Sequence, residues 1–154
     1  MIKLALTVVF VLGSTSAISQ TVKNVPFDEC FTGAANRFQV SKVVLVAIAK
    51  TESTFNPVAV SQTNTDGSFD VGMMQINSSW FPKLQKLGIV NHDLLNGCTN
   101  IYVGAWILSH NIKSYGNKWK AVGAYNARTP LKQVAYVNKV MTATADIKQN
   151  YLLR

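Results

Sequence analysis

Apolar residues recur at helical spacing along much of the chain. One stripe follows the positions i, i+4, i+7 and i+11 and predicts a long amphipathic helix: Ile101, Ala105, Leu108 and Ile112. Three further helices are predicted, at about 26–38, 119–127 and 130–145. The first has acidic residues in its first turn, and the last begins with a proline after Thr129. The chain is therefore expected to be mainly α.

The segment 42–53 has two interpretations. Its seven consecutive apolar residues, from Val43 to Ala49, include several β-branched ones, so a buried strand competes with a helix. Ser41 favours the helix because serine is a good N-cap. If the segment is helical, Glu52 shares a stripe with Leu45 and faces inward.

The stretch 56–70 breaks the helical pattern. It is rich in Asn, Ser, Thr, Asp and Gly, which predicts a loop or a short irregular hairpin, with a small β-turn region near 63–71. The 154 residues, 48% of them hydrophobic and 14% charged, suit one compact domain with a proper core. The predicted fold is a single helical domain with a small hairpin region.

The first 17 residues have the layout of a secretory signal peptide. Lys3 is followed by an apolar stretch from Leu4 to Leu12 and by small residues that end at Ala17. This stretch is shorter than the roughly 20 residues that span a bilayer, so an uncleaved anchor is the weaker interpretation. We expect cleavage near Ala17, export of the protein, and a mature domain over 18–154.

Export changes the interpretation of the cysteines. In an oxidising compartment Cys30 and Cys98 are expected to pair and to close a loop of roughly 70 residues, which stabilises the fold by about 4 kcal/mol. Two separate buried thiols are the alternative. A metal site is not expected, because these cysteines, His92 and His110 show no C-x-x-C or H-x-x-x-H spacing.

The chain is basic. Its formal net charge is +8 and becomes +7 without Lys3. Such an excess often indicates nucleic acid, but the basic residues stand singly, with no Lys/Arg run and no interleaved aromatic stripe. For an exported protein the expected polyanion is a cell-wall polymer or a membrane surface. A solvated basic surface that keeps the protein soluble is the alternative.

Glu52 is one of only two glutamates in the chain. On a helix, Lys50 lies about 200° around the axis from it and cannot easily neutralise it. An unpaired carboxyl on an apolar stripe has its charged form disfavoured, so we expect its pKa to rise. General acids use glutamates with pKa values of roughly 6 to 7. The alternative is a glutamate at a frayed helix end that reaches water.

Three ordered motifs carry a family resemblance: ESTFNP at 52–57, GMMQIN at 72–77 and AYNA at 124–127. They resemble the E-S-x-F/W-N-P, G-x-M-Q-I-N and A-Y-N-A signatures of soluble lytic transglycosylases, which share the lysozyme-like fold. The resemblance extends over about 27–136. Small size, signal peptide and cysteine pair are most similar to the specialised bacterial enzymes that accompany type III and type IV secretion, conjugation and pilus assembly.

The resemblance implies that Glu52 is the single acid/base. It implies cleavage of the β-1,4 bond between N-acetylmuramic acid and N-acetylglucosamine in peptidoglycan, with a 1,6-anhydromuramic ring as product. Ser61 and Gln75 match positions that contact the sugar near the cleaved bond. Tyr125 matches a tyrosine that helps to stabilise the transition state. No cofactor is implied.

Further residues belong to the predicted site. Met74 is included because methionine is adaptable enough to line a groove, although a core position is favoured for it. Asn126 is expected to support the fold at that wall of the cleft. Asp70 lies in a stretch similar to the hairpin of animal-type lysozymes, at the position of their second catalytic carboxylate. Arg128 stands where the family usually has glycine after A-Y-N-A, so the turn there must differ or tolerate another residue.

We therefore expect a lysozyme-like domain over 18–154 that acts in the periplasm as a peptidoglycan lytic transglycosylase and opens the wall locally for a secretion or conjugation apparatus. Its expected partners are glycan strands and components of that apparatus; we expect a monomer and no nucleic-acid partner. Two alternatives stay open. One is a lysozyme-type hydrolase that uses Glu52 and Asp70, and the other is a non-catalytic wall-binding assembly factor.

Overall fold

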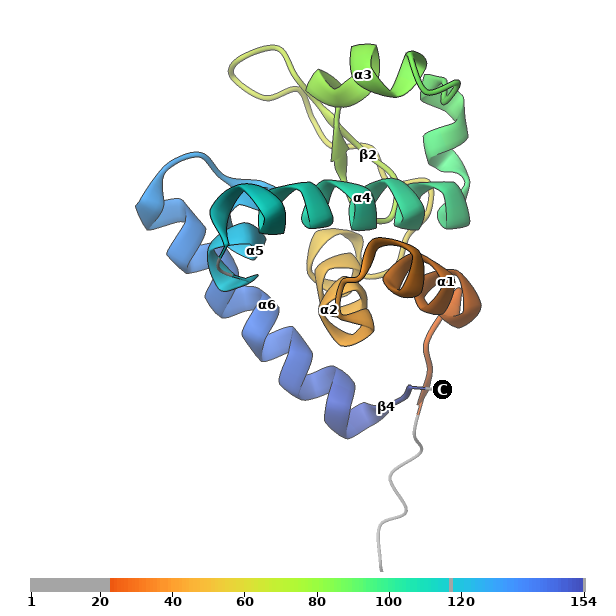
Figure 1. Ribbon diagram of the computed structural model, residues 1–154, viewed down its shortest axis with the longest axis vertical. Helices are drawn as coiled ribbons and strands as arrows, with labels where there is room; N and C mark the ends of the chain where they lie inside the picture. Colours follow the sequence, from red (N-terminus) through yellow and green to blue (C-terminus); the bar gives the residue numbers. More distant parts are fainter. Residues whose placement is uncertain (1–22, 117, 154) are drawn as a thin grey trace, which may run out of the picture.

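The computed structural model describes residues 23–116 and 118–153, so the predicted signal peptide at 1–17 lies outside the described residues. The helices are α1 (Asp28–Phe38), α2 (Lys42–Ser53), α3 (Phe81–Gln85), α4 (Gly97–Tyr115), α5 (Lys118–Asn126) and α6 (Pro130–Asn150). Short 3-10 helices are η1 (Ser78–Trp80) and η2 (Asn91–Leu95), and the strands are β1 (Lys23–Asn24), β2 (Asp70–Val71), β3 (Ile76–Asn77) and β4 (Tyr151–Leu152). In Figure 1, α4 crosses the middle, with the hairpin and α3 on one side and α1, α2 and α6 on the other.

The mainly helical prediction is confirmed, and the segment 42–53 is a helix rather than a strand. Its apolar run exists because α2 packs against α1, α4 and α6, so that every residue from Leu45 to Ala49 is fully buried. A helix that is enclosed on most sides needs apolar residues nearly all round. The last helix continues to Asn150, beyond the predicted end near 145.

The predicted loop or hairpin region leads into a short two-stranded hairpin. β2 and β3 pair antiparallel, with Asp70 opposite Asn77 and Val71 opposite Ile76, and Val60 forms an isolated bridge to Val71. Residues 63–69 form the predicted loop, at the tip of this small lobe, and β3 lies beyond the predicted region. The short helices α3, η1 and η2, which the apolar pattern did not predict, connect the lobe to α4.

A buried amide attaches the hairpin to α4. Asn100 is fully buried and its Oδ1 accepts a hydrogen bond from the backbone N–H of Met74 at 2.7 Å. Its Nδ2 donates to the carbonyls of Val71 and Leu94, each at 2.9 Å. Gly72, with φ of 78°, is required beside it because a Cβ there would lie 2.1 Å from Asn100 Nδ2. Three backbone groups that water cannot reach are thereby satisfied.

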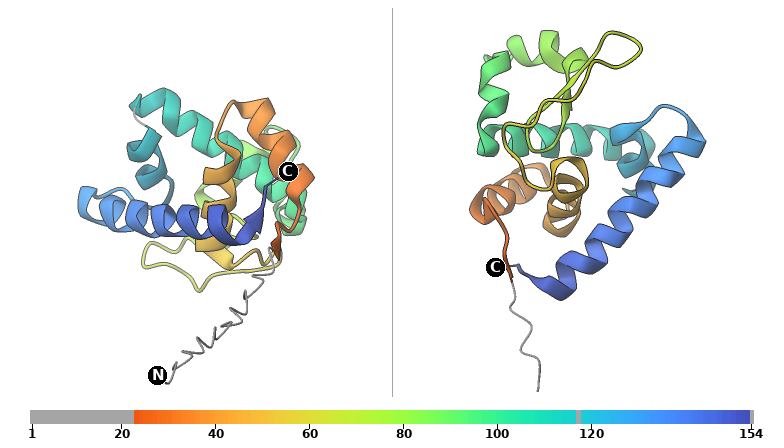
Figure 2. Two further views of the ribbon diagram at one scale, coloured as in Figure 1. Left: turned by 90° about the horizontal axis from the view of Figure 1, so that it is seen from below. Right: turned by 180° about the vertical axis from the view of Figure 1, so that it is seen from behind.

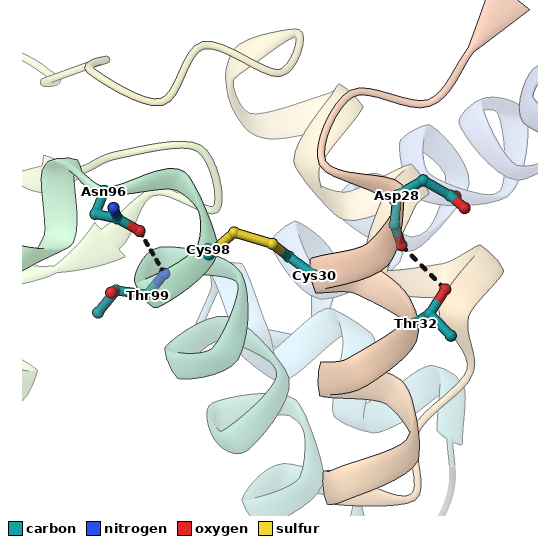
Figure 3. Close-up of a disulfide and its surroundings, with 6 residues drawn as sticks. All are labelled: Asp28, Cys30, Thr32, Asn96, Cys98 and Thr99. Carbon is teal, nitrogen blue, oxygen red and sulfur yellow. Dashed lines mark hydrogen bonds between the residues drawn. A yellow bond between two sulfur atoms is a disulfide. The ribbon is translucent and has the colours of Figure 1, made fainter.

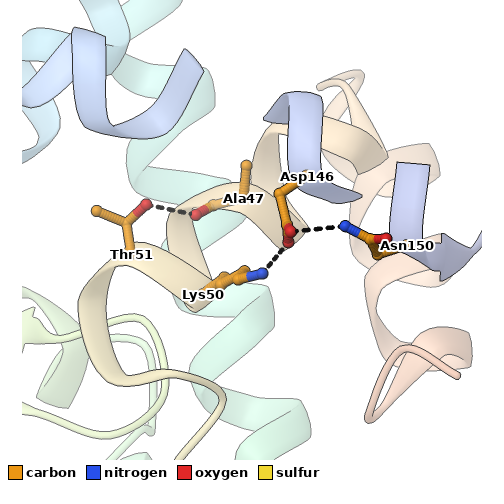
Figure 4. Close-up of polar contacts among 5 residues, drawn as sticks. All are labelled: Ala47, Lys50, Thr51, Asp146 and Asn150. Atoms are coloured by element: carbon orange, nitrogen blue, oxygen red, sulfur yellow. Dashed lines mark hydrogen bonds and ion pairs between the residues drawn. The ribbon is translucent and has the colours of Figure 1, made fainter. Parts of the chain in front are cut away.

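The C-terminal segment holds α6 against α2. Lys50 on α2 forms an ion pair with Asp146 on α6, whose other carboxylate oxygen accepts from Asn150 Nδ2 at 2.8 Å (Figure 4). The Lys50 ammonium also lies 4.8 Å from the ring centre of Tyr151. β4 then pairs in parallel with β1, which brings the two ends of the described chain together (Figure 2).

The predicted disulfide is confirmed. Cys30 on α1 is bonded to Cys98 in the first turn of α4, with the two Cα atoms 5.3 Å apart (Figure 3). Asn96 caps the same turn, since its side chain accepts from the backbone N–H of Thr99 at 3.0 Å. The bond closes a separation of 68 residues that includes α2 and the hairpin.

Two features are absent from the part of the chain that the structure describes. None of its helices combines the length and the apolar character that a membrane crossing requires. No group of three or more His, Cys, Asp or Glu side chains in residues 23–116 and 118–153 is placed to hold a metal ion.

Candidate active site

A cleft of about 620 Å³ separates the hairpin lobe from the α5–α6 region. The hairpin wall consists of residues from 64–70 and 75–80, and the opposite wall of residues from 124–132. Glu52 lies between them at the end of α2. In the right-hand view of Figure 2, the hairpin loop and the turn between α5 and α6 project on the same side of the molecule.

The residues that follow Glu52 turn the chain sharply away from α2. Thr54 and Phe55 both have left-handed backbone conformations, with φ of 53° and 65°, so the helix ends at once. The Ser53 hydroxyl donates to the carbonyl of Met73 at 2.8 Å and accepts from the N–H of Asn56 at 3.0 Å. The E-S-T-F-N-P motif therefore fixes the end of α2 to the hairpin.

Glu52 is half-buried and is held by a residue that the motifs did not identify. The hydroxyl of Tyr136, on α6, donates a hydrogen bond to Glu52 Oε1 at 2.5 Å. Tyr136 is only 5% exposed, and burial and the nearby Glu52 raise the pKa of its hydroxyl. One signal was available: a tyrosine on the inner stripe of a helix needs a partner for its hydroxyl.

Burial raises the pKa of the Glu52 carboxyl to about 7. The hydrogen bond from Tyr136 opposes this effect, the charge of Asp70 adds to it, and Lys139 on α6 opposes it. The expected rise in pKa is thus present, and its main cause is the desolvation that the apolar stripe predicted. Glu52 can hold or release a proton near neutral pH.

Asp70 lines the cleft on the hairpin wall. Its Oδ1 accepts from Asn77 Nδ2 at 2.9 Å, and its Oδ2 lies 3.4 Å from both Ser61 Oγ and Asn64 Nδ2. Its backbone N–H donates to Ser61 Oγ at 2.8 Å. The carboxylate is therefore held in a fixed orientation by the small lobe.

Gln75 and Tyr125 line the cleft, and each donates a hydrogen bond to the backbone of the hairpin segment 72–74. The Gln75 Nε2 donates to the carbonyls of Gly72 at 2.9 Å and Ala59 at 3.3 Å. The Tyr125 hydroxyl donates to the carbonyl of Met74 at 3.0 Å. Gly104 makes room for this contact, because a Cβ there would lie 2.9 Å from both the Tyr125 hydroxyl and Met74 Cε.

Three of the predicted site residues occupy different positions relative to the cleft: one is in the core, one contacts the cleft residue Asp70 and one lines the cleft. The Met74 side chain is fully buried in the core, so it acts on the site through its backbone and not as a sugar contact. Ser61 contacts Asp70 and Gln62 and does not line the cleft. Asn126 is exposed and lines the cleft wall. The core position of Met74 was the favoured alternative, whereas the contact of Ser61 with Asp70 could not be predicted from the motifs.

A helical body, a small hairpin lobe and an acidic residue in the cleft between them define the lysozyme-like class of proteins. Residues 29–143 match the family described as Transglycosylase SLT domain. The match covers well over half of the chain, so the chain belongs to this family. It is a peptidoglycan lytic transglycosylase.

Two relatives share much of the sequence. The chain is 44% identical over 111 residues to the invasion protein IagB of Salmonella typhimurium, covering 71% of this chain and 69% of the relative. It is 38% identical over 106 residues to the protein IpgF of Shigella sonnei, covering 68% and 69%.

A solved structure supports the fold. An inactive variant of the lytic transglycosylase Slt of Pseudomonas aeruginosa matches with a TM-score of 0.65 at 20% identity. The match covers 81% of this chain and 24% of that much longer one. At this identity the comparison shows the fold alone.

The buried acid predicts a pH-dependent gain of stability in Glu52→Gln. The folded-state pKa of about 7 lies above the unfolded value, so ionisation of Glu52 destabilises the fold as the pH rises from about 5 to 8. A glutamine keeps an acceptor for Tyr136 and cannot ionise. We expect the variant to gain roughly 2 kcal/mol in the free energy of unfolding at pH 8 relative to pH 5, allowing for the carboxyl's partial exposure to water.

Urea unfolding at the two pH values checks this expectation. Glu29→Gln, in the exposed first turn of α1, is the matched control and should show no such gain at pH 8. A Glu52→Gln effect that is the same at both pH values would contradict a raised pKa.

Proposed function

We propose that the protein cleaves the β-1,4 bond between N-acetylmuramic acid and N-acetylglucosamine and leaves a 1,6-anhydromuramic product, with Glu52 as acid and then base. The observation that carries this proposal is the Glu52 carboxyl in the cleft, with a pKa of about 7. At neutral pH about half of the molecules then hold the proton that a leaving sugar oxygen needs.

In the first step the Glu52 carboxyl gives its proton to the glycosidic oxygen, and the bond from C1 breaks with its electron pair remaining on that oxygen. In the second step the Glu52 carboxylate takes the proton of the C6 hydroxyl on the muramic ring, and O6 forms the new bond to C1. The proton on Glu52 is restored and no water is consumed. Since the attacking hydroxyl is already part of the reacting ring, its placement lowers the entropic part of the barrier.

The surrounding side chains support these steps. Tyr136 holds Glu52 Oε1 and so fixes the orientation of the carboxyl. We propose that Gln75 and Tyr125 contact the sugar at the cleaved bond, and that Ser61 acts by orienting Asp70.

Two alternatives remain worth testing. A hydrolase is favoured by Asp70, because a second carboxylate in the cleft can serve as nucleophile or stabilise positive charge at C1. Lysozyme itself hydrolyses its substrate with such a pair of carboxylates. A non-catalytic wall-binding protein is less well supported, because pure binding needs no acid with a pKa near neutral pH.

Mass spectrometry of the fragments released from purified peptidoglycan distinguishes the two reactions. We expect muropeptides that end in 1,6-anhydromuramic acid. Products with a reducing end, heavier by one water, would instead establish hydrolysis and make Asp70 the next residue to mutate.

Glu52→Gln is the control in the same experiment. It should bind sacculi and release no fragments, because it has no proton to give. Equal release by both proteins would rule out Glu52 as the catalyst. If neither protein released fragments while both bound, the protein would be a wall-binding factor.

We propose further that the protein works in the periplasm and opens the wall locally for a secretion or conjugation apparatus, whose components would be its partners. The predicted signal peptide, the family resemblance and the similarity to a protein named as an invasion protein support this role. A strain that carries Glu52→Gln should grow normally but export less through the apparatus. Unchanged export would contradict the role.

A further inference from the structure

The two walls of the cleft carry opposite charges. Asp66 and Asp70 lie on the hairpin wall. Arg128, in the turn before α6, and Lys132, in the first turn of α6, lie on the opposite wall. Both cationic side chains are exposed. The cleft thus offers two cations at one of its walls, facing the region where a glycan strand would lie.

Neither Arg128 nor Lys132 is paired with an acidic side chain in the part of the chain that the structure describes. The obvious acceptor, Asp66, is held within its own loop, where it accepts from Ser68 N at 3.0 Å and Ser68 Oγ at 2.7 Å. These bonds hold the pKa of Asp66 below its usual value, and the charge of Arg128 adds only a smaller contribution.

The main chain at Arg128 is held independently of its side chain. Gln133 Nε2, on α6, donates to the carbonyl of Ala127 at 2.9 Å and lies 3.5 Å from that of Arg128. Gly123 allows this close crossing, since a Cβ there would lie 2.8 Å from Gln133 Cβ.

Arg128 is also free of backbone strain. It is not among the described residues with a positive φ, so the turn does not need the glycine that the family usually has there. The fold therefore requires neither the charge nor the length of the Arg128 side chain.

We propose that Arg128, assisted by Lys132, binds a carboxylate of the substrate beside the cleaved bond. The guanidinium presents a planar set of donors that matches a carboxylate with two parallel hydrogen bonds. The glycan strand supplies such groups from two sources: the free carboxylates of its stem peptides, and the lactyl carboxylate of muramic acid that has lost its peptide. This inference rests on the proposed function and adds a determinant of substrate choice.

The test compares native sacculi with sacculi whose carboxyl groups have been converted to methylamides. At limiting substrate, the wild type should release fragments about tenfold more slowly from the amidated sacculi, as expected for one lost hydrogen-bonded charge pair. Arg128→Gln should be about tenfold slower than wild type on native sacculi, with little further loss on amidated ones. Lys132→Gln should show the same pattern with a smaller loss.

Lys148→Gln is the matched control, because Lys148 is an exposed lysine at the far end of the same helix. It should keep the wild-type rates on both substrates. An equal loss in this variant would show that only the overall charge matters and would overturn the proposal. So would an Arg128→Gln protein that retains the wild-type preference for native sacculi.

A binding measurement separates this inference from the proposed function. In the Glu52→Gln background, co-sedimentation with native and amidated sacculi reports the contribution of Arg128 without turnover. If the wild type released no fragments, the proposed reaction would be contradicted. Co-sedimentation would still test whether Arg128 binds a carboxylate of the sacculi. Peptide-stripped strands, which carry a free lactyl carboxylate on each muramic acid, distinguish the sources: an Arg128 effect that disappears on them assigns the stem peptide, and one that persists shows that Arg128 binds the lactyl carboxylate.

Discussion

The contact between Glu52 and Tyr136 is the constraint on which the site depends. It joins the end of α2 to α6. It also encloses the Glu52 carboxyl, whose pKa burial raises to about 7. The position of α6 is therefore as important as that of α2. The Lys50–Asp146 ion pair and the pairing of β4 with β1 hold α6 in that position from its C-terminal end, far from the cleft.

The opposite wall depends on a second set of contacts, which are mostly to the backbone. Asn100, Ser53 and Tyr125 each bind a backbone group of Met73 or Met74. They come from α4, α2 and α5, so three helices fix one short segment of the hairpin. Many residues of the motifs that resemble the transglycosylase family therefore hold the hairpin lobe in place. Only some of them line the cleft.

Much of this structure follows from the apolar pattern. Long helices with a continuous stripe were predictable, and the stripe through Leu45 and Glu52 correctly indicated a carboxyl whose pKa burial raises. The two-residue strands β1 and β4 were not predictable, because they pair across almost the whole chain and carry no pattern of their own. The inner position of Tyr136 indicated that its hydroxyl needs a partner, but not which one, because Glu52 lies 84 residues away and only the tertiary structure brings the two together.

The central claim is that Glu52 is a half-buried acid with a pKa near 7. The chain has only two glutamates, Glu29 and Glu52, so protein labelled with ¹³C at glutamate Cδ gives two carboxyl signals, and Glu52→Gln identifies the one that belongs to the cleft. Following that signal by NMR from pH 3 to 9 measures the pKa directly. We predict a midpoint of about 7 for Glu52. A midpoint near the ordinary glutamate value of about 4.3 would contradict the claim, since a carboxyl ionised at neutral pH has no proton to give.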